Sequence, residues 1–115
     1  MTEAQADDAV ARIFDGTYEQ RKSSKAALQF HIYDRMAQKD GIALEGDTIC
    51  NSLYATSDLF RNVPAVMPVS ERFTELMDER LQAVVDEIRS KEVPFRRTEE
   101  VEACRYCDFK MICGR

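Results

Sequence analysis

Three of the four cysteines in the chain stand in one short segment at its C-terminus, which reads Cys104-Arg-Tyr-Cys107-Asp-Phe-Lys-Met-Ile-Cys113-Gly-Arg. Thiolates held close together are unfavourable unless a soft metal neutralises them, and a C-x2-C turn brings two sulfurs to one metal. The third cysteine follows after a short loop. Because three thiolates leave one coordination position for another ligand, this segment predicts a metal site that is completed from elsewhere.

Composition limits the class of protein. At 115 residues and 44% hydrophobic content, the chain suits one small globular domain. Its net charge of −5 argues against an autonomous nucleic-acid binder, which needs a net basic face. No signal-peptide core opens the chain and no apolar run could span a bilayer, so we expect a cytoplasmic protein without membrane contact. A reducing compartment favours a metal site over a disulfide framework for the cysteines.

Two amphipathic helices are expected at the ends of the globular part. Thr2 and Gln5 have the spacing of a capping box, and apolar residues then recur at helical intervals until Gly16. Ser70 is expected to cap a long helix that ends near Lys91 and has the most regular apolar pattern in the chain.

A third helix is expected between these two. Residues 16–23 form a polar loop, and Ser23 or Ser24 would cap a helix from about Lys25 to Gln38, which Asp40-Gly41 closes. Apolar residues cover most of this helix and leave one narrow polar stripe. It is therefore expected to be largely buried.

Residues Asp47–Thr56 predict a strand because they are rich in β-forming residues and follow a Gly-Asp turn signal. The next residues, 57–69, contain Pro64 and Pro68 and predict a loop with a short edge strand near Ala65–Val69. The fold class is therefore α+β, with three helices and one or two short strands.

Lys25, Gln29 and Tyr33 recur at every fourth residue, so their polar ends lie on one face of the second helix. Gln29 stands among apolar neighbours, where an unpaired amide would be costly. It either hydrogen-bonds a partner within the packing or points into a polar site. From the residues alone, hydrogen-bonded packing is the more common explanation.

The segment Lys25-Ala-Ala-Leu-Gln29-Phe-His-Ile-Tyr33, a β-rich segment, a long helix and the cysteine tail occur in this order. This arrangement resembles the C-terminal part of PD-(D/E)XK nucleases. It is similar above all to the RecB/AddB-like iron–sulfur branch, also found in CRISPR-associated exonucleases. The resemblance covers residues from about 20 to 115, and the cysteine spacing is its most specific part. It implies that residues 1–103 belong to the α/β nuclease domain and residues 104–115 form a metal-binding tail.

The resemblance also implies roles for individual residues. Gln29 and Tyr33 match a glutamine and a tyrosine that face the active site and DNA in this family, and Lys25 is expected to contact a phosphate. Cys104, Cys107 and Cys113 match three cluster cysteines of the family. Together with a cysteine far upstream, their thiolates would ligate a structural [4Fe–4S] cluster.

The catalytic residues of the family have no match here. Phosphodiester hydrolysis by these enzymes uses acidic residues that hold Mg²⁺ and a lysine, carried on strands before the glutamine helix. In this chain those positions read as helix and loop, and Asp108-Phe-Lys110 spells D-x-K only inside the cysteine loop. We therefore expect the C-terminal segment of a larger DNA repair or recombination exonuclease, inactive alone. DNA and a helicase subunit or domain are its expected partners.

A second interpretation is a small non-enzymatic module with structural zinc, in which Cys50 or His31 joins the three tail cysteines. A lone cysteine in a strand is more often a small apolar residue, however. His31 falls on the polar stripe with Asp34, Arg35 and Gln38, which favours exposure to solvent. A third outcome is a tail with three free thiols and no metal.

Overall fold

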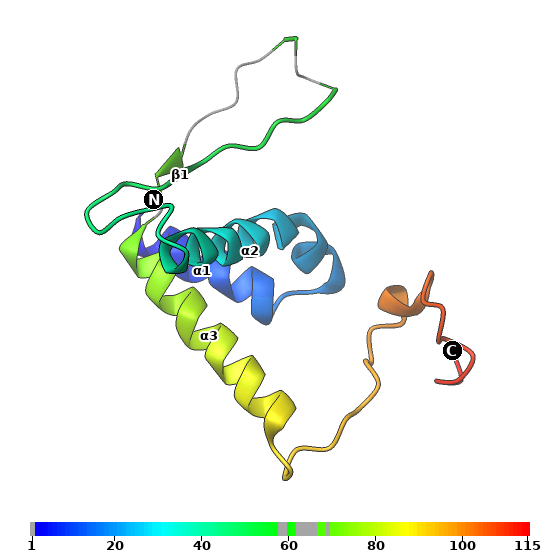
Figure 1. Ribbon diagram of the computed structural model, residues 1–115. Coiled ribbons are helices and arrows are strands. Elements are labelled where there is room, and N and C mark those ends of the chain that lie inside the picture. Colours follow the sequence, from blue (N-terminus) through cyan, green and yellow to red (C-terminus); the bar gives the residue numbers. More distant parts are fainter. Residues whose placement is uncertain (1, 58–59, 62–66, 69) are drawn as a thin grey trace.

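Three helices make up most of the secondary structure in this computed structural model, which describes residues 2–57, 60–61, 67–68 and 70–115 (Figure 1). The elements in chain order are α1 (Glu3–Phe14), α2 (Tyr18–Lys39), β1 (Cys50–Asn51), β2 (Met67–Pro68), α3 (Glu71–Arg89) and the 3-10 helix η1 (Val101–Cys104). The protein is therefore mostly helical. None of the described helices combines the length and apolar character that crossing a bilayer would need.

α1 begins where the sequence predicts. The Thr2 hydroxyl accepts a hydrogen bond from the Gln5 N–H at 3.3 Å, and the Gln5 side chain accepts one from the Thr2 N–H at 2.9 Å. This capping box satisfies two N–H groups that the first turn leaves without helical partners. The helix ends just before Gly16, where a Cβ atom would collide with the carbonyl oxygen of Arg12.

α2 begins seven residues before its predicted start at Lys25, so the loop predicted over residues 16–23 is wrong. Thr17 and Gln20 form a second capping box, with bonds of 3.3 and 2.9 Å between the same atoms as in α1. Ser23 lies inside the helix, and its hydroxyl donates to the Gln20 carbonyl at 2.9 Å. A side-chain bond to the preceding turn is how serine is accommodated within a helix.

The predicted end of α2 is confirmed. Gly41 has a φ of 73°, and the Ile42 N–H donates to the Ala37 carbonyl at 2.9 Å. These are the features of a Schellman motif, which closes a helix with a left-handed glycine. α3 also follows its prediction, because the Ser70 hydroxyl accepts from the Phe73 N–H at 3.3 Å.

The predicted strands are much shorter in the structure. Of the predicted strand Asp47–Thr56, only Cys50 and Asn51 are extended and paired, antiparallel to Met67–Pro68. Met67 and Pro68 fall within the edge strand predicted near Ala65–Val69, and the other residues of that predicted strand lie outside the described residues. The β-formers of the predicted strand have little apolar surface to pack against, and strand propensity depends on such packing.

The core lies between α1 and α3. Its buried side chains recur at intervals of three or four residues in both helices, so each helix contributes one apolar stripe. The core residues are Ala6, Val10, Ile13, Phe73 and Met77. α2 adds the partly buried Ala27 and Leu28 to this cluster.

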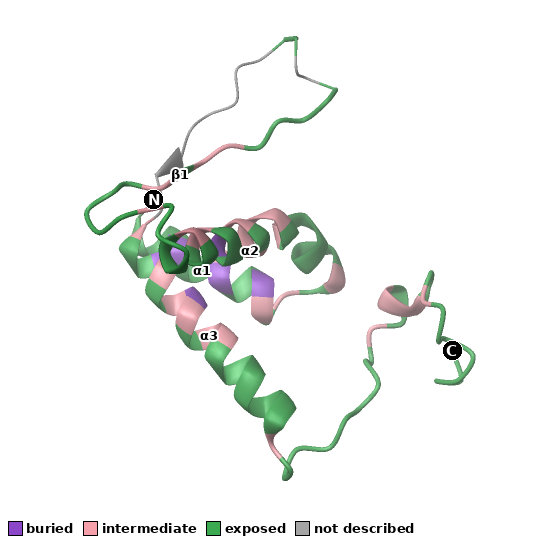
Figure 2. Ribbon diagram, viewed as in Figure 1, coloured by how far each residue is buried: buried purple, intermediate pink, exposed green. Residues whose placement is uncertain are grey.

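The prediction that α2 is largely buried is wrong. His31 is its one buried residue, whereas Ile32, Tyr33 and Met36 are all at least 40% exposed. Figure 2 shows α2 mostly in the colours of exposed and intermediate residues. The prediction that His31 is exposed is therefore wrong as well. α2 packs on the core through Ala27 and Leu28 and contacts α3 through His31 and Arg35, which leaves Ile32, Tyr33 and Met36 facing outward.

The second half of α3 also carries an exposed apolar stripe. α1 has 12 residues and α3 has 19. At about 1.5 Å of rise per residue, α1 is too short to cover α3. Val84, Val85 and Ile88 consequently project from the core at 39 to 60% exposure. The radius of gyration of 17.1 Å exceeds the value of about 13 Å that a compact domain of this size would have.

One carboxylate ties α2 to α3. Asp78 accepts hydrogen bonds from Arg35 through both of its oxygens, and His31 Nε2 lies 2.9 Å from Asp78 Oδ1. The His31 ring also meets Phe73 edge-on, with centroids 6.3 Å apart. Burial lowers the pKa of His31 below its ordinary value of 6.5, the charge of Arg35 acts in the same direction, and Asp34 opposes them. The fold therefore favours neutral His31, which donates its Nε2 hydrogen to Asp78.

Thr17→Ala tests where α2 begins. We expect this variant to lower the free energy of unfolding by about 1 kcal/mol, because the first turn loses its cap. Ser23→Ala is the matched control at the predicted cap, and it should change the free energy by less than about 0.5 kcal/mol. Chemical denaturation followed by circular dichroism measures both. A larger loss for Ser23→Ala would place the functional helix start at the predicted position.

His31→Gln tests the buried histidine. Because the pKa of His31 is lowered in the folded state, the unfolded chain binds the proton more readily, and stability falls as the pH drops below about 6.5. Glutamine does not titrate. We expect the variant to lose less free energy of unfolding than the wild type between about pH 7.5 and pH 5.5. Parallel losses in the two proteins would contradict a buried neutral histidine.

Candidate functional site

Gln29 and Tyr33 form a polar pair on the outer face of α2. The Gln29 Nε2 group donates to the Tyr33 hydroxyl oxygen at 2.7 Å, and both side chains are exposed. Gln29 is thus not the half-buried amide that its apolar neighbours suggest. An amide has two N–H donors and an acceptor, so one bond to Tyr33 leaves hydrogen-bonding capacity for a ligand.

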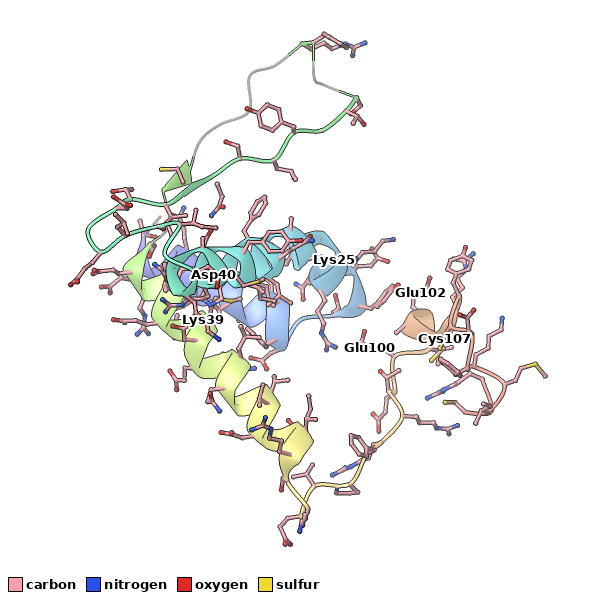
Figure 3. The ribbon with its side chains drawn as sticks, in the orientation of Figure 1. Lys25, Lys39, Asp40, Glu100, Glu102 and Cys107 are labelled. Carbon is pink, nitrogen blue, oxygen red and sulfur yellow. The ribbon has the colours of Figure 1, made fainter. Side chains whose placement is uncertain are left out.

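Lys25 lies one turn before Gln29 on the same helix and is exposed (Figure 3). The three residues that the sequence places on one face therefore all reach solvent from α2. A flexible ammonium group next to an amide and a phenol can bind a phosphate oxygen while the other two contact a sugar or a base. Their role in binding is still a prediction.

An ion pair to α2 and two internal hydrogen bonds position the C-terminal segment 97–115. Arg21 of α2 forms an ion pair with Glu100 at 3.4 Å, just before η1. Within this segment, Arg97 donates to the Cys113 carbonyl, and Arg115 donates to the Thr98 carbonyl at 2.8 Å. The N-terminal part of α2, which carries Arg21 and Lys25, therefore lies on the same side of the molecule as the cysteine segment (Figure 3).

A series of turns carries the tail cysteines. The Cys107 N–H donates to the Cys104 carbonyl at 3.1 Å, and the Cys113 N–H donates to the Phe109 carbonyl at 3.2 Å. Cys104 and Cys107 are half-buried, whereas Cys113 is exposed. All three are free thiols, as is the exposed Cys50 of β1.

The tail only partly fits a metal cluster. Three thiols are suitable soft donors for iron or zinc. Among the residues that the structure describes, however, no three His, Cys, Asp or Glu side chains converge as a metal site requires. Cys50 lies in β1, away from the tail (Figure 1), and the Nε2 atom of His31 is engaged with Asp78. In this arrangement neither Cys50 nor His31 supplies the fourth ligand that a zinc site with the three tail cysteines would need.

Asp108 and Lys110 lie in the same turns, exposed and outside any strand. Their D-x-K spacing therefore has none of the strand context of a catalytic motif, as the sequence predicts. Asp7 is paired with Arg72 at 3.2 Å, and Glu100 with Arg21, so these acidic groups act as surface ion pairs.

A polar cleft of about 490 Å³ opens between the C-terminal half of α2 and the first turns of α3. His31, Asp34 and Arg35 line one side, and Glu71 and Glu75 line the other. Sequence reasoning missed this cleft because the residues that line it, and those that bond to them, come from segments far apart in the chain. The Asp34 carboxylate accepts from Asn51 at 2.9 Å, and Asp78 is 47 residues from His31. Only the position of Asp78 directly after the core residue Met77 hinted at a role between helices.

Comparison with known families gives a match over most of the chain. The family model described as the PD-(D/E)XK nuclease superfamily matches residues 7–114, which include the Gln29–Tyr33 pair and all three tail cysteines. No curated protein and no solved structure matches the chain. Since the match spans nearly the whole sequence, the chain belongs to the PD-(D/E)XK nuclease superfamily.

Proposed function

We propose that this chain is the C-terminal part of a metal-dependent deoxyribonuclease of the RecB/AddB-like branch, acting as an exonuclease in DNA repair or recombination. Membership of the PD-(D/E)XK nuclease superfamily supports nuclease chemistry. The observation that carries the proposal is the exposed Gln29–Tyr33 pair, hydrogen-bonded at 2.7 Å on a free face of the longest helix.

The acidic residues that hold Mg²⁺ and the catalytic lysine would come from strands preceding this segment in the larger protein. The apolar stripe of α3 supports this arrangement. Val84, Val85 and Ile88 continue the core stripe of α3 but are left without cover by α1 and α2. Exposed apolar surface of this kind marks a place where another element packs. In this proposal the other element is the remainder of the nuclease domain.

Gln29 and Tyr33 would position the substrate strand. Their mutual hydrogen bond restricts both side chains, so less entropy is lost when they contact DNA. Lys25 would neutralise a backbone phosphate one turn away. The Mg²⁺ ion would activate water and stabilise charge on the phosphate, while these residues orient the strand.

Gln29→Ala in the full-length nuclease tests this assignment. We expect kcat/KM for DNA cleavage to fall by about two- to tenfold, since a hydrogen bond to a sugar or a base, which are neutral groups, contributes about 0.5–1.5 kcal/mol. The control is Gln82→Ala, because Gln82 is an exposed residue of α3 that makes the equivalent bond to Asp86 at 2.9 Å. Equal cleavage rates in the two variants, both folded, would remove Gln29 from the site.

We also propose that the tail thiolates hold a structural metal centre once the larger protein supplies a fourth ligand. A [4Fe–4S] cluster with an upstream cysteine is the form that the family resemblance implies. Such a centre would fasten the tail to a distant part of the chain, in addition to the Arg21–Glu100 ion pair. Zinc is the competing occupant, and the two metals are distinguished by visible absorption and by metal analysis.

Cys107→Ser tests the metal proposal. In the metal-loaded nuclease we expect its melting temperature to fall by about 5 °C or more, with DNA binding reduced more than the cleavage step. Cys50→Ser is the control, because Cys50 is an exposed thiol outside the tail. Equal melting temperatures and equal metal contents in the two variants would contradict a metal centre in the tail.

A further inference from the structure

Cys104 and Cys107 are placed as partners for each other. Cys104 ends η1, and the chain then turns so that the Cys107 N–H donates to the Cys104 carbonyl at 3.1 Å. A turn of this kind keeps its first and fourth Cα atoms within about 7 Å. Disulfides join Cα atoms about 4.4–6.8 Å apart. The backbone therefore holds the Cα atoms of Cys104 and Cys107 at a separation compatible with a disulfide.

The other cysteines are less suitably placed. Cys113 is exposed, and its backbone is held by Arg97 through the carbonyl oxygen and by Phe109 through the N–H. Cys50 is exposed in β1, on another part of the molecule (Figure 1). Cys104 and Cys107 share a turn and are both half-buried, so they are less open to bonding with a second protein molecule than the exposed Cys50 and Cys113.

We propose that Cys104 and Cys107 form a reversible intramolecular disulfide when no metal occupies the tail. The oxidant is a small-molecule disulfide such as oxidised glutathione. The thiolate of one cysteine attacks it, forms a mixed disulfide and releases one reduced thiol. The second cysteine then attacks the mixed disulfide, closes the Cys104–Cys107 bond and releases the second reduced thiol. Two electrons and two protons pass from the protein to the oxidant.

This bond would control metal loading. A disulfide sulfur does not ligate iron or zinc as a thiolate does, so the oxidised tail loses two of its three donors. Loading would then require prior reduction. This consequence rests on the proposed metal centre, whereas formation of the disulfide itself does not.

The test uses the metal-free chain, prepared with a chelator and equilibrated with oxidised glutathione. Free thiols are alkylated, and the protein is denatured and digested with trypsin. Cleavage after Arg97, Arg105 and Lys110 separates the three tail cysteines into peptides 98–105, 106–110 and 111–115. We expect the free-thiol count to fall from four to two, with peptides 98–105 and 106–110 joined. Dithiothreitol should restore all thiols.

Matched variants make the outcome specific. Cys113→Ser and Cys50→Ser should form the same linked peptides, and Cys107→Ser should not. The proposal is overturned if peptide 111–115 carries the main link, if intermolecular dimers dominate, or if the thiol count stays at four. The experiment involves neither DNA nor metal. Its failure would therefore leave the nuclease proposal standing, and unchanged cleavage in Gln29→Ala would leave the disulfide proposal standing.

Discussion

The packing of α1 against α3 supports the rest of this small structure. Ala6, Val10 and Ile13 of α1 meet Phe73 and Met77 of α3, and Ala6 and Met77 are completely buried. At about 25 cal/mol per Å² of buried apolar surface, a core of this size provides limited stabilisation. The outer apolar surface of α2 and the second half of α3 remains exposed, which is how a segment of a larger domain would look before its neighbours pack against it.

Polar contacts then position α2 on this core. Asp78 is shared by His31 and Arg35, so one carboxylate fixes the place of α2, while burial and the charge of Arg35 favour the neutral state of its histidine. The inner strip of α2 is used for packing, and the opposite face carries Gln29 and Tyr33. This division of one helix into a structural and an outward face would allow the pair to contact the proposed DNA substrate without loss of core packing.

The superfamily match assigns nuclease-type function, but a fold family hosts many activities and the site decides among them. The proposed sites lie in two places, the outer face of α2 and the cysteine tail. The Arg21–Glu100 ion pair connects them, although an exposed pair of this kind contributes little by itself. A metal centre would connect them more firmly. The same thiols can instead bond to each other, so the state of the tail depends on its redox environment.

The amino-acid sequence by itself determined the features that depend on neighbours three or four residues away. These include the capping box of α1, the serine cap of α3, the common face of Gln29 and Tyr33, and the turn between Cys104 and Cys107. The start of α2 belongs to this group too, because Thr17 and Gln20 repeat the signal seen at Thr2, although the prediction overlooked it. Only the tertiary structure decided which faces are buried. His31 is buried because Asp78 and Phe73, more than 40 residues away, come to lie against it, and no local pattern records that contact.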